Sequence, residues 1–451
     1  MTQALVVGGG AAGLAAALEL QRRGVEVRLI EATPRVGGVV QTEHREGYLF
    51  ERGPNTMQGK PTLRPFLEAN ALEPLLVPAS PASRRRWLWH DGRLEAVPMD
   101  PLSFLRTRLL TGRGKLRLLR EPFVARGDAS RESVDEFVRR RLGDEALENL
   151  VAPFLTGVYA GDETKLGAAA VFGALVDLER EHGSIVRGAL RRALGRRDRP
   201  RPLRGSFSTS EGLGGLVTRL AARLGERVAT STRAVALGRD SRGFRVELEA
   251  GEPLRAERVV LALPASECAA LVASLEPEVA EALRSIVYAP VASVSVGVRR
   301  ADTREPIAGF GFLVPKRGGL DLLGCLFMSQ LYPGRAPEAH ELLTGFLGGS
   351  RSPGSVDEAD DEIFARMARD LERTHGLRGE PQRLGLTRWP RAIAQPGPLH
   401  RATVAFVRER IARRRGLAIA GSFLDGVALA DTLVCGAAAA RSVLEEPASA
   451  S

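Results

Sequence analysis

The stretch that decides the fold is ALVVGGGAAGLAAALELQRRGVEVRLIEATPRVGG, residues 4–38. Its apolar start, 4–7, predicts a buried parallel strand. Gly8, Gly10 and Gly13 follow in the G-x-G-x-x-G spacing, apolar residues recur at helical spacing from Leu14, and 25–31 predicts a second strand. Together these segments predict a strand–helix–strand unit of the Rossmann type.

Each glycine of this unit serves a different purpose. Gly8 allows a tight turn, Gly10 lets the backbone approach a pyrophosphate, and Gly13 lets the helix pack closely on the strand. The helix N-terminus offers free N–H groups and the positive end of its dipole to phosphates. Glu31 ends the second strand, where a carboxylate accepts hydrogen bonds from ribose hydroxyls. The unit therefore predicts a dinucleotide site.

Residues after this unit resemble the flavin amine-oxidase superfamily. They are Arg35-x-Gly37-Gly38 and then Glu51-x-Gly53-Pro54. In that superfamily the two segments close over the pyrophosphate and the flavin ring, so the resemblance implies FAD. By position, it implies that FAD contacts Gly8, Gly9, Gly10, Ala11, Ala12, Gly13, Glu31, Ala32, Arg35, Gly37, Gly38, Gly53, Pro54, Asn55, Thr56, Val235, Trp389, Val427, Ala428 and Leu429.

Composition excludes several other classes of protein. The three cysteines, Cys268, Cys325 and Cys435, stand far apart, which predicts neither a disulfide framework nor a metal site and fits a reducing compartment. The six histidines are scattered without a ligand motif, so we expect no metal. No charge-free apolar stretch is long enough to predict a transmembrane helix.

The net charge of +10 predicts anionic partners. Only 5% of residues are aromatic and no basic-aromatic stacking motif occurs, so we do not expect nucleic acid to be the partner. Leucine and phenylalanine are mixed with arginine and lysine at helical spacing in 102–123 and 184–207. This pattern fits either a surface that docks on an anionic membrane or a helical subdomain with a solvated basic face. We expect a cytoplasmic protein, peripheral on the cytoplasmic face of the membrane.

The order of predicted elements indicates an α/β fold in three parts. Alternating strands and helices return after 206 and near the C-terminus, whereas 285–350 is rich in apolar strands. We expect a discontinuous Rossmann-like FAD-binding domain, a mixed-sheet substrate-binding domain, and a helical, basic subdomain of a membrane-binding type. Their predicted ranges are 1–62, 206–270 and 386–446 for the first, 63–97 and 271–385 for the second, and 98–205 for the third.

Five further blocks, in order, resemble the protoporphyrinogen oxidase family. They are RRRWLWHDGRLEAVP (84–98), PFLTGVYAGD (153–162), GFGFLVP (309–315), TRWPRAIAQ around Trp389, and GSFLDGVALAD (421–431). The family oxidises protoporphyrinogen IX to protoporphyrin IX in haem biosynthesis, by three hydride transfers to FAD, and oxygen reoxidises the flavin with release of H2O2. The resemblance implies that Arg86 pairs with a substrate propionate, and that the tetrapyrrole contacts Gly157, Phe310, Leu313, Leu326 and Phe346.

The chemistry of a porphyrinogen agrees with this assignment. A large apolar ring with a few carboxylates requires a broad apolar cavity and one or two arginines, whose planar fork binds carboxylate. Hydride transfer is the cofactor's chemistry, and we identify no catalytic acid or base in the sequence. The resemblance also leads us to expect a homodimer and hand-over of the product to a chelatase.

Three alternatives remain open from the sequence. Coproporphyrinogen III carries four propionates and is the nearest rival substrate. Another substrate of the flavin amine-oxidase superfamily is a second alternative, although four tyrosines and three tryptophans give little material for an amine oxidase's aromatic cage. A carrier that binds flavin or porphyrin without turnover is the third.

Overall fold

The computed structural model describes residues 2–194 and 203–445. The predicted strand–helix–strand unit is confirmed: β1 (Thr2–Val7) is followed by α1 (Ala11–Arg22) and then by β2 (Val27–Ile30), which pairs with β1 in parallel. The second strand is shorter than predicted. Apolar residues of β1 and β2 are buried on both faces of the sheet, as the unbroken apolar run requires.

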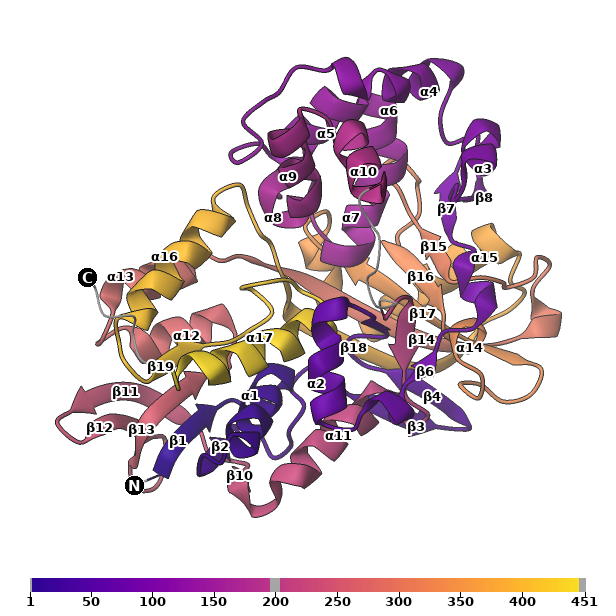
Figure 1. Cartoon of the computed structure of the whole chain (residues 1–451). Helices are drawn as coiled ribbons and strands as arrows, with labels where there is room; N and C mark the ends of the chain where they lie inside the picture. The colour runs from indigo at the N-terminus through magenta and orange to yellow at the C-terminus, as the bar shows by residue number, and fades with distance from the viewer. Residues whose placement is uncertain (1, 195–202, 446–451) are drawn as a thin grey trace.

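The first sheet is built from segments that lie far apart in the sequence (Figure 1). Its strand order is β10-β2-β1-β13-β12-β11, and β19 pairs with β13. The pairings of β1, β2, β10, β13 and β19 are parallel and those of β11 and β12 are antiparallel, so the sheet is mixed. The later strands are β10 (Val228–Ala229), β11 (Ala234–Asp240), β12 (Gly243–Leu248), β13 (Leu254–Leu261) and β19 (Leu417–Ile419). The predicted return of the chain to this sheet is therefore confirmed.

Helices from later parts of the chain complete this layer. The helix α17 (Leu429–Ser442) packs against α1, and α11 (Gly212–Leu224) packs against α1 on another side. Gly436 makes the first contact close, because a Cβ there would lie 2.0 Å from the carbonyl oxygen of Ala12. Other helices of this layer are α2 (Arg64–Ala69), α12 (Ala265–Val272), α13 (Pro277–Arg284) and α16 (His400–Ala412).

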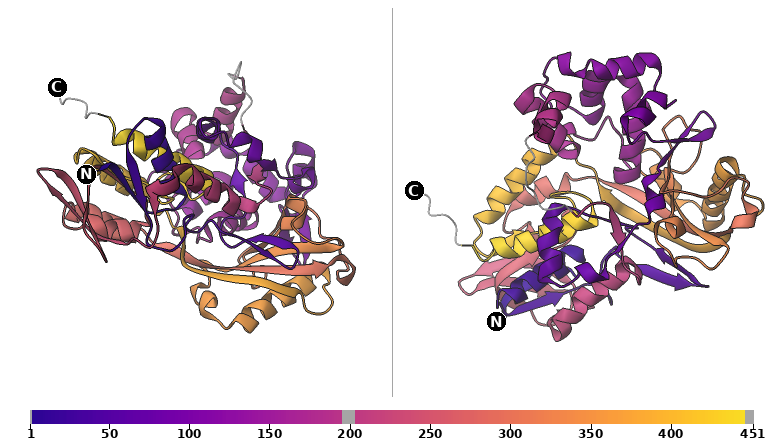
Figure 2. Two further views of the ribbon diagram at one scale, coloured as in Figure 1. Left: turned by 90° about the horizontal axis from the view of Figure 1, so that it is seen from below. Right: turned by 45° about the vertical axis from the view of Figure 1, so that its right-hand side comes forward.

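The second sheet is also mixed, in the order β18-β14-β17-β16-β15-β7-β8. Only the β15–β7 pairing is parallel. Its strands are β7 (Trp87–His90), β8 (Arg93–Ala96), β14 (Tyr288–Arg299), β15 (Gly311–Leu313), β16 (Gly324–Phe327), β17 (His340–Gly348) and β18 (Gln382–Ala394). The helix α15 (Asp360–His375) packs on one face, and the helical subdomain stands on the other side (Figure 2, left).

Local signals in the sequence correspond to local structure. The hairpin β7–β8 turns at Asp91 and Gly92, whose φ angles are +48° and +76°, as predicted. Short strands also form two small sheets: β3 (Thr42–Arg45) with β4 (Tyr48–Glu51), and β9 (Ser206–Ser208) between β5 (Met57–Gln58) and β6 (Val77–Pro78). The helix α14 (Met328–Leu331) follows β16.

The helical subdomain forms a separate group of helices, of which α7 reaches the second sheet at β15 (Figure 1). Its helices are α3 (Pro101–Arg106), α4 (Gly112–Leu119), α5 (Val134–Leu142), α6 (Asp144–Ala146), α7 (Ala152–Tyr159), α8 (Ala168–Val171), α9 (Gly173–His182) and α10 (Ile185–Leu194). Ser133 and Glu136 form the predicted capping box at the start of α5. The basic segment at 195–202, part of the predicted amphipathic pattern, lies outside the described residues. None of the helices that the structure describes is both long and apolar enough to cross a bilayer.

Two elements cut across the predicted domain ranges. The boundary at 386 falls inside β18, which belongs along its whole length to the second sheet. Phe66 and Leu67, predicted within the substrate-binding part, pack in the core of the first sheet. The mixed second sheet is as expected, whereas the mixed character of the first sheet, due to the antiparallel pairings of β11 and β12, was not predicted. The division into three domains stays a prediction.

Candidate active site

The glycine turn after β1 has the geometry that a pyrophosphate needs. Gly8 has a φ of +107°, and a Cβ on Gly13 would lie 1.8 Å from the carbonyl oxygen of Gly8. The positive φ of Gly8 and the close approach at Gly13 therefore require glycine at both positions. At Gly10, by contrast, no heavy atom of the described chain lies within 4 Å of the position a Cβ would take, so the backbone is open to a ligand there.

The first residues of two helices lie near this turn. Ala11 and Ala12 begin α1 and are buried, and α17 packs directly on Ala12. Ala428 caps the N-terminus of α17 without a side-chain hydrogen bond, and no side chain caps α1 either. Both helices therefore keep N–H groups for an anionic or polar ligand. Val427 and Leu429 flank Ala428 in the same turn.

Glu31 closes the opposite side of the glycine turn. Its carboxylate accepts hydrogen bonds from the N–H of Gly9 at 2.7 Å and from the N–H and hydroxyl of Thr33 at 2.8 Å. These bonds fix the carboxylate directly beside the glycines, and Ala32 follows it at the end of the strand. This is the position expected for a group that binds ribose.

A distant segment runs past the same strand end. The N–H groups of Ser231 and Thr232 donate to the carbonyl oxygens of Thr33 and Glu31, at 3.0 and 2.8 Å. Three residues later the register of β11 against β12 shifts at Val235, whose side chain is 46% exposed. Val235 is thus brought toward the nucleotide side of Glu31, where the resemblance places adenine.

The loop around Arg35 forms a second layer on the glycine turn. The N–H of Gly37 donates to the carbonyl oxygen of Gly9 at 2.8 Å, and a Cβ on Gly38 would lie 3.3 Å from the Cα of Gly10. Arg35 donates to the carbonyl oxygen of Gly38 at 2.6 Å, so its side chain holds the loop in shape.

The Gly53–Thr56 turn packs against this loop. A Cβ on Gly53 would lie 1.9 Å from the carbonyl oxygen of Val39. Asn55, between Pro54 and Thr56, is buried, and its amide nitrogen donates to the Gly53 carbonyl at 3.0 Å. Its Oδ1 is buried and lacks a partner in the described chain. A buried acceptor without a donor calls for a ligand with a polar edge, as a flavin has.

Trp389 connects this turn to the second sheet. Its indole N–H donates to the carbonyl oxygen of Arg52 at 2.8 Å, and the Arg52 guanidinium donates to the Thr387 hydroxyl at 3.0 Å. The turn, the open glycine and the two helix ends together fit FAD, with the sheet face bearing Trp389 on the substrate side.

Predicted substrate residues share one face of the second sheet. Leu313 pairs with Gly324, which pairs with Phe346, and Leu326 lies two residues from Gly324 on the same face. Gly157 of α7 approaches this face, because a Cβ there would lie 2.4 Å from the Cδ2 of Leu313. The fold therefore brings these four predicted residues to one apolar surface, which we call the apolar wall.

Arg86 lies at one end of the apolar wall. The carbon of its guanidinium lies 4.6 Å from the ring centroid of Phe310, which directly precedes β15. No acidic side chain in the described residues pairs with it, and partial burial lowers its pKa from the ordinary value. An unpaired cation beside an apolar wall can bind a carboxylate.

Sequence reasoning missed the buried ion pair between Glu51 and Arg335, which lies just before the Gly53–Thr56 turn. Glu51 accepts hydrogen bonds from the Leu213 N–H at 2.9 Å, the Thr42 hydroxyl at 2.6 Å and the Arg335 guanidinium at 3.1 Å. Burial raises the pKa of Glu51, and the charge of Arg335 opposes that rise. Glu51 stands in the quoted motif, but Arg335 is nearly 300 residues away and no local pattern marks it.

A second missed cation, Arg351, follows β17 near the apolar wall. Its guanidinium donates to the carbonyl oxygen of Val314 at 3.2 Å, whereas its Nε and Nη2 are buried without a partner. Sequence reasoning also missed the ion pair between Lys60 and Asp431 in the first turn of α17. The Lys60 Nζ lies 2.5 and 2.6 Å from the two carboxylate oxygens of Asp431.

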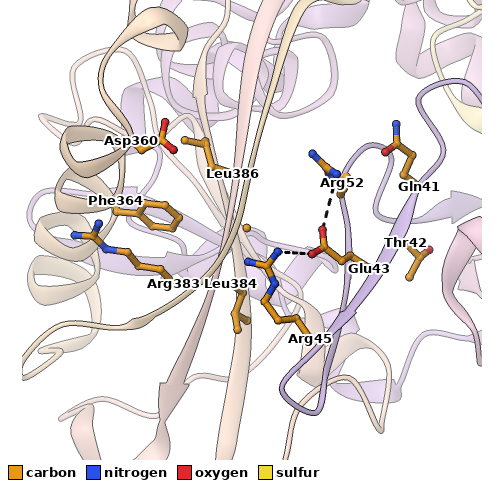
Figure 3. Close-up of a pocket in the computed structure, with 11 residues that line it drawn as sticks. Gln41, Thr42, Glu43, Arg45, Arg52, Asp360, Phe364, Arg383, Leu384 and Leu386 are labelled. Carbon is orange, nitrogen blue, oxygen red and sulfur yellow. Dashed lines mark hydrogen bonds and ion pairs between the residues drawn. The ribbon is translucent and has the colours of Figure 1, made fainter. Parts of the chain in front are cut away.

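A polar groove of about 510 Å³ lies between the β3–β4 hairpin, β18 and α15, and Thr42 and Arg52 are among the residues that line it (Figure 3). Glu43 pairs there with Arg45 at 2.6 Å and with Arg52 at 3.9 Å. Arg383 pairs with Asp361. Because its arginines are neutralised by neighbouring acids and no predicted site residue lines it, the groove is not the candidate site.

Comparison with known proteins places this geometry in context. The family described as flavin containing amine oxidoreductase matches residues 11–444. A chloroplastic protoporphyrinogen oxidase 1 of Spinacia oleracea is 34% identical over 94% of this chain and 81% of its own length. A coproporphyrinogen III oxidase of Bacillus subtilis is 28% identical over 98% of this chain and 97% of its own. A solved structure from Exiguobacterium sp. 255-15, provisionally assigned as a protoporphyrinogen oxidase, has a TM-score of 0.81 and 27% identity, and each chain covers 99% of the other.

Proposed function

The chain belongs to the family of flavin containing amine oxidoreductases, and from this premise we propose that it is a porphyrinogen oxidase that converts protoporphyrinogen IX to protoporphyrin IX. The observation that carries the proposal is the apolar wall with the unpaired Arg86 at its end, next to the Gly53–Thr56 turn. Oxygen is the proposed final acceptor, and haem biosynthesis the proposed context.

FAD, when bound, supplies the two-electron acceptor for each of three successive hydride transfers. The chain supplies the positions. Gly10 leaves the space for the pyrophosphate, the N-terminal turn of α17 offers its N–H groups, and Trp389 is fixed by the Arg52 carbonyl on the substrate side. No acid or base in the site is required for this role, and we assign none.

The apolar wall supports a broad, largely apolar substrate. Leu313, Leu326 and Phe346 present carbon surface, and Gly157 keeps α7 close without adding bulk. Arg86 supplies one guanidinium fork for a propionate. A substrate amine would instead meet an unpaired cation here, which argues against an amine oxidase.

Coproporphyrinogen III is the second candidate substrate. The Bacillus subtilis relative is named as an oxidase of that compound, and Arg351, which forms no ion pair with a described residue, adds a second cation near the apolar wall. Four propionates need more cationic partners than two.

Porphyrin fluorescence tests the proposal directly. The FAD-loaded protein in air is expected to form porphyrin from protoporphyrinogen or coproporphyrinogen faster than either oxidises by itself, with release of H2O2. A protein that retains FAD and porphyrin but accelerates neither oxidation is a carrier, and the proposal fails. Faster oxidation of coproporphyrinogen alone replaces the proposed substrate with the second candidate.

The exposed end of the helical subdomain supports docking on an anionic membrane. We define the outer face by Leu119, Phe123 and Leu190 with the neighbouring Arg120 and Arg187. The three apolar side chains are 70%, 82% and 61% exposed, and neither arginine forms an ion pair with a described residue. Apolar side chains flanked by free arginines are the pattern of an interfacial anchor. Attachment of the protein to the cytoplasmic face of the membrane, homodimer formation and hand-over to a chelatase all stay predictions.

A further inference from the structure

Arg351 stands where three elements of the site meet. Its own loop follows β17, and the N–H of the preceding Ser350 donates to the carbonyl oxygen of Ala160, directly after α7, at 2.7 Å. Its guanidinium reaches the carbonyl oxygen of Val314, directly after β15, at 3.2 Å. These three elements carry Phe346, Gly157 and Leu313, so Arg351 lies at the edge of the apolar wall.

The guanidinium of Arg351 is poorly satisfied. It makes one hydrogen bond, and its Nε and Nη2 are buried without any acceptor. No described carboxylate lies within ion-pair distance, and Asp162 and Glu163 only influence it from farther away. Burial lowers the pKa of Arg351, which means that the charge has already lost much of its hydration. Such a cation gains strongly from a carboxylate partner.

Arg351 and Arg86 bracket the apolar wall. Arg86 packs on Phe310, just before β15, and Arg351 bonds to Val314, just after it. Four residues of extended strand separate those two contact points, which corresponds to roughly 13 Å. The two cations therefore lie near opposite ends of β15, at opposite edges of a macrocycle that lies along this strand.

We propose that Arg351 binds a carboxylate of coproporphyrinogen III, the second candidate substrate, at the edge of the apolar wall opposite Arg86. This inference rests on the proposed porphyrinogen oxidase function and adds a determinant of substrate choice. Nε and Nη2 are enclosed by protein atoms, so the proposed binding requires the side chain to turn, at the cost of its hydrogen bond to the Val314 carbonyl oxygen. Arg351 thus acts in binding and positioning, without a part in hydride transfer.

The two candidate substrates use such a pair of cations differently. In protoporphyrinogen IX both propionates lie on neighbouring pyrrole rings, at one edge of the macrocycle. Coproporphyrinogen III carries a propionate on every ring and therefore presents carboxylates at opposite edges together. Arginines at both ends of the apolar wall therefore let coproporphyrinogen III form a contact with Arg351 in addition to the contact with Arg86 that either substrate can form.

Equilibrium binding of the porphyrin products isolates this contribution. Fluorescence titration of the FAD-loaded protein with coproporphyrin III compares the wild type with Arg351→Gln, and with Arg86→Gln at the other end. We expect Arg351→Gln to weaken coproporphyrin binding about tenfold, as loss of a charge-assisted bond implies. Protoporphyrin binding is expected to change about twofold or less, and the uncharged tetramethyl ester of coproporphyrin should bind both proteins equally.

The matched control is Arg317→Gln, an arginine close to the same strand end whose side chain is 87% exposed. It should leave every binding constant unchanged. Equal weakening of the acid and its ester by Arg351→Gln would show a packing role and overturn the inference, as would unchanged binding of the acid.

A conservative variant covers the case in which Arg351→Gln does not retain FAD. Arg351→Lys keeps the charge and loses the planar fork, so we expect about threefold weaker coproporphyrin binding with an unchanged ester. Unchanged binding of the acid would refute the role of Arg351. Turnover assays separate the two proposals: a wild type that binds porphyrins but oxidises no porphyrinogen refutes the function, whereas normal turnover with insensitivity to Arg351 refutes only this inference.

Discussion

At Gly10 the absence of a side chain leaves the space that the pyrophosphate of FAD is proposed to occupy. An added side chain there meets no described atom, whereas one at Gly13 lies 1.8 Å from the Gly8 carbonyl oxygen. Gly10→Val should therefore fold with near-normal thermal stability yet lose FAD, because its side chain fills the space of the pyrophosphate. Visible flavin absorbance of the purified protein, beside its melting temperature, measures both effects.

Gly13→Ala provides the contrast. Its new methyl group must displace the backbone, so this variant should lose stability as well as FAD. If Gly10→Val keeps its flavin, the pyrophosphate does not lie over this glycine and the assignment of the site is wrong.

His375, at the end of α15, predicts the pH dependence of stability. Its ring is 1% exposed, with Phe327 and Phe312 at 5.3 and 6.0 Å, and burial lowers its pKa to about 4. In the unfolded chain His375 binds a proton below about pH 6.5, whereas in the folded chain it remains neutral down to about pH 4. The free energy of unfolding is therefore unaffected by His375 above pH 6.5 and decreases as the pH falls toward 4. At pH 5 this costs about 2 kcal/mol, and His375→Gln should remove that loss in pH-dependent urea unfolding.

Asp370, also on α15, titrates with the opposite sign. Burial raises its pKa to about 6, so its contribution is greatest in acid and is lost as pH rises through 6. The wild type should therefore show a shallower acid loss than His375 alone implies, and Asp370→Asn should steepen it. Parallel pH profiles of wild type and Asp370→Asn would contradict this account.

The role of a single residue could be predicted from the sequence where the backbone conformation allows only one residue type. The spacing of Gly8, Gly10 and Gly13 reflects turn geometry and close packing, and the structure requires glycine at Gly8 and Gly13 as expected. Arg351 and Arg335 carry no such mark among the 64 lysines and arginines. Their importance comes from burial, which only the tertiary fold creates.

Among the elements, those with local signals were predictable and those defined by distant pairing were not. The Asp91-Gly92 hairpin and the Ser133 capping box depend on a few adjacent residues. The strand β18 is 13 residues long and crosses the predicted boundary at 386, because its partner β14 lies about 95 residues earlier. No local pattern states which sheet a strand joins.

One buried carboxylate connects three elements of the helical subdomain. Glu121, fully buried, pairs with Arg141 of α5 and accepts hydrogen bonds from the Ser184 hydroxyl at 2.5 Å and the Ile185 N–H at 2.9 Å, at the start of α10. Glu121→Gln leaves Arg141 buried with less compensation and should destabilise the subdomain by about 3 kcal/mol. Hydrogen exchange should show faster opening of α5 and α10 with the first sheet unchanged.

The control is Asp135→Asn, which breaks an exposed pair with Arg139 and should change stability by less than about 0.5 kcal/mol. Equal effects of the two substitutions would mean that the buried network adds nothing beyond surface charge.

The molecule has a net charge of +10, and its outer face combines exposed apolar side chains with arginines. This combination predicts docking on a membrane. The outer face should bind vesicles that contain anionic lipid and ignore neutral ones, because arginines supply attraction and leucines supply insertion. Phe123→Ser should reduce co-sedimentation about tenfold, since one buried aromatic contributes a free energy of this order. Leu399→Ser, at a residue 67% exposed outside the helical subdomain, should have no effect.

Equal binding to neutral and anionic vesicles would contradict the role of the arginines. Loss of binding in Leu399→Ser to the same degree would show that any exposed apolar side chain suffices, and the outer face would then have no special part.

The order in which the first sheet is assembled has a consequence for synthesis of the protein. β1 is synthesised long before β19, which begins at residue 417, and the α17 helix that packs on α1 follows β19. At about 5–20 residues per second, the nascent chain carries an incomplete nucleotide sheet for roughly 20–80 s. During that time β1 and α1 expose apolar surface that no local segment covers. We therefore expect the flavin site to be completed only after α17 has been synthesised.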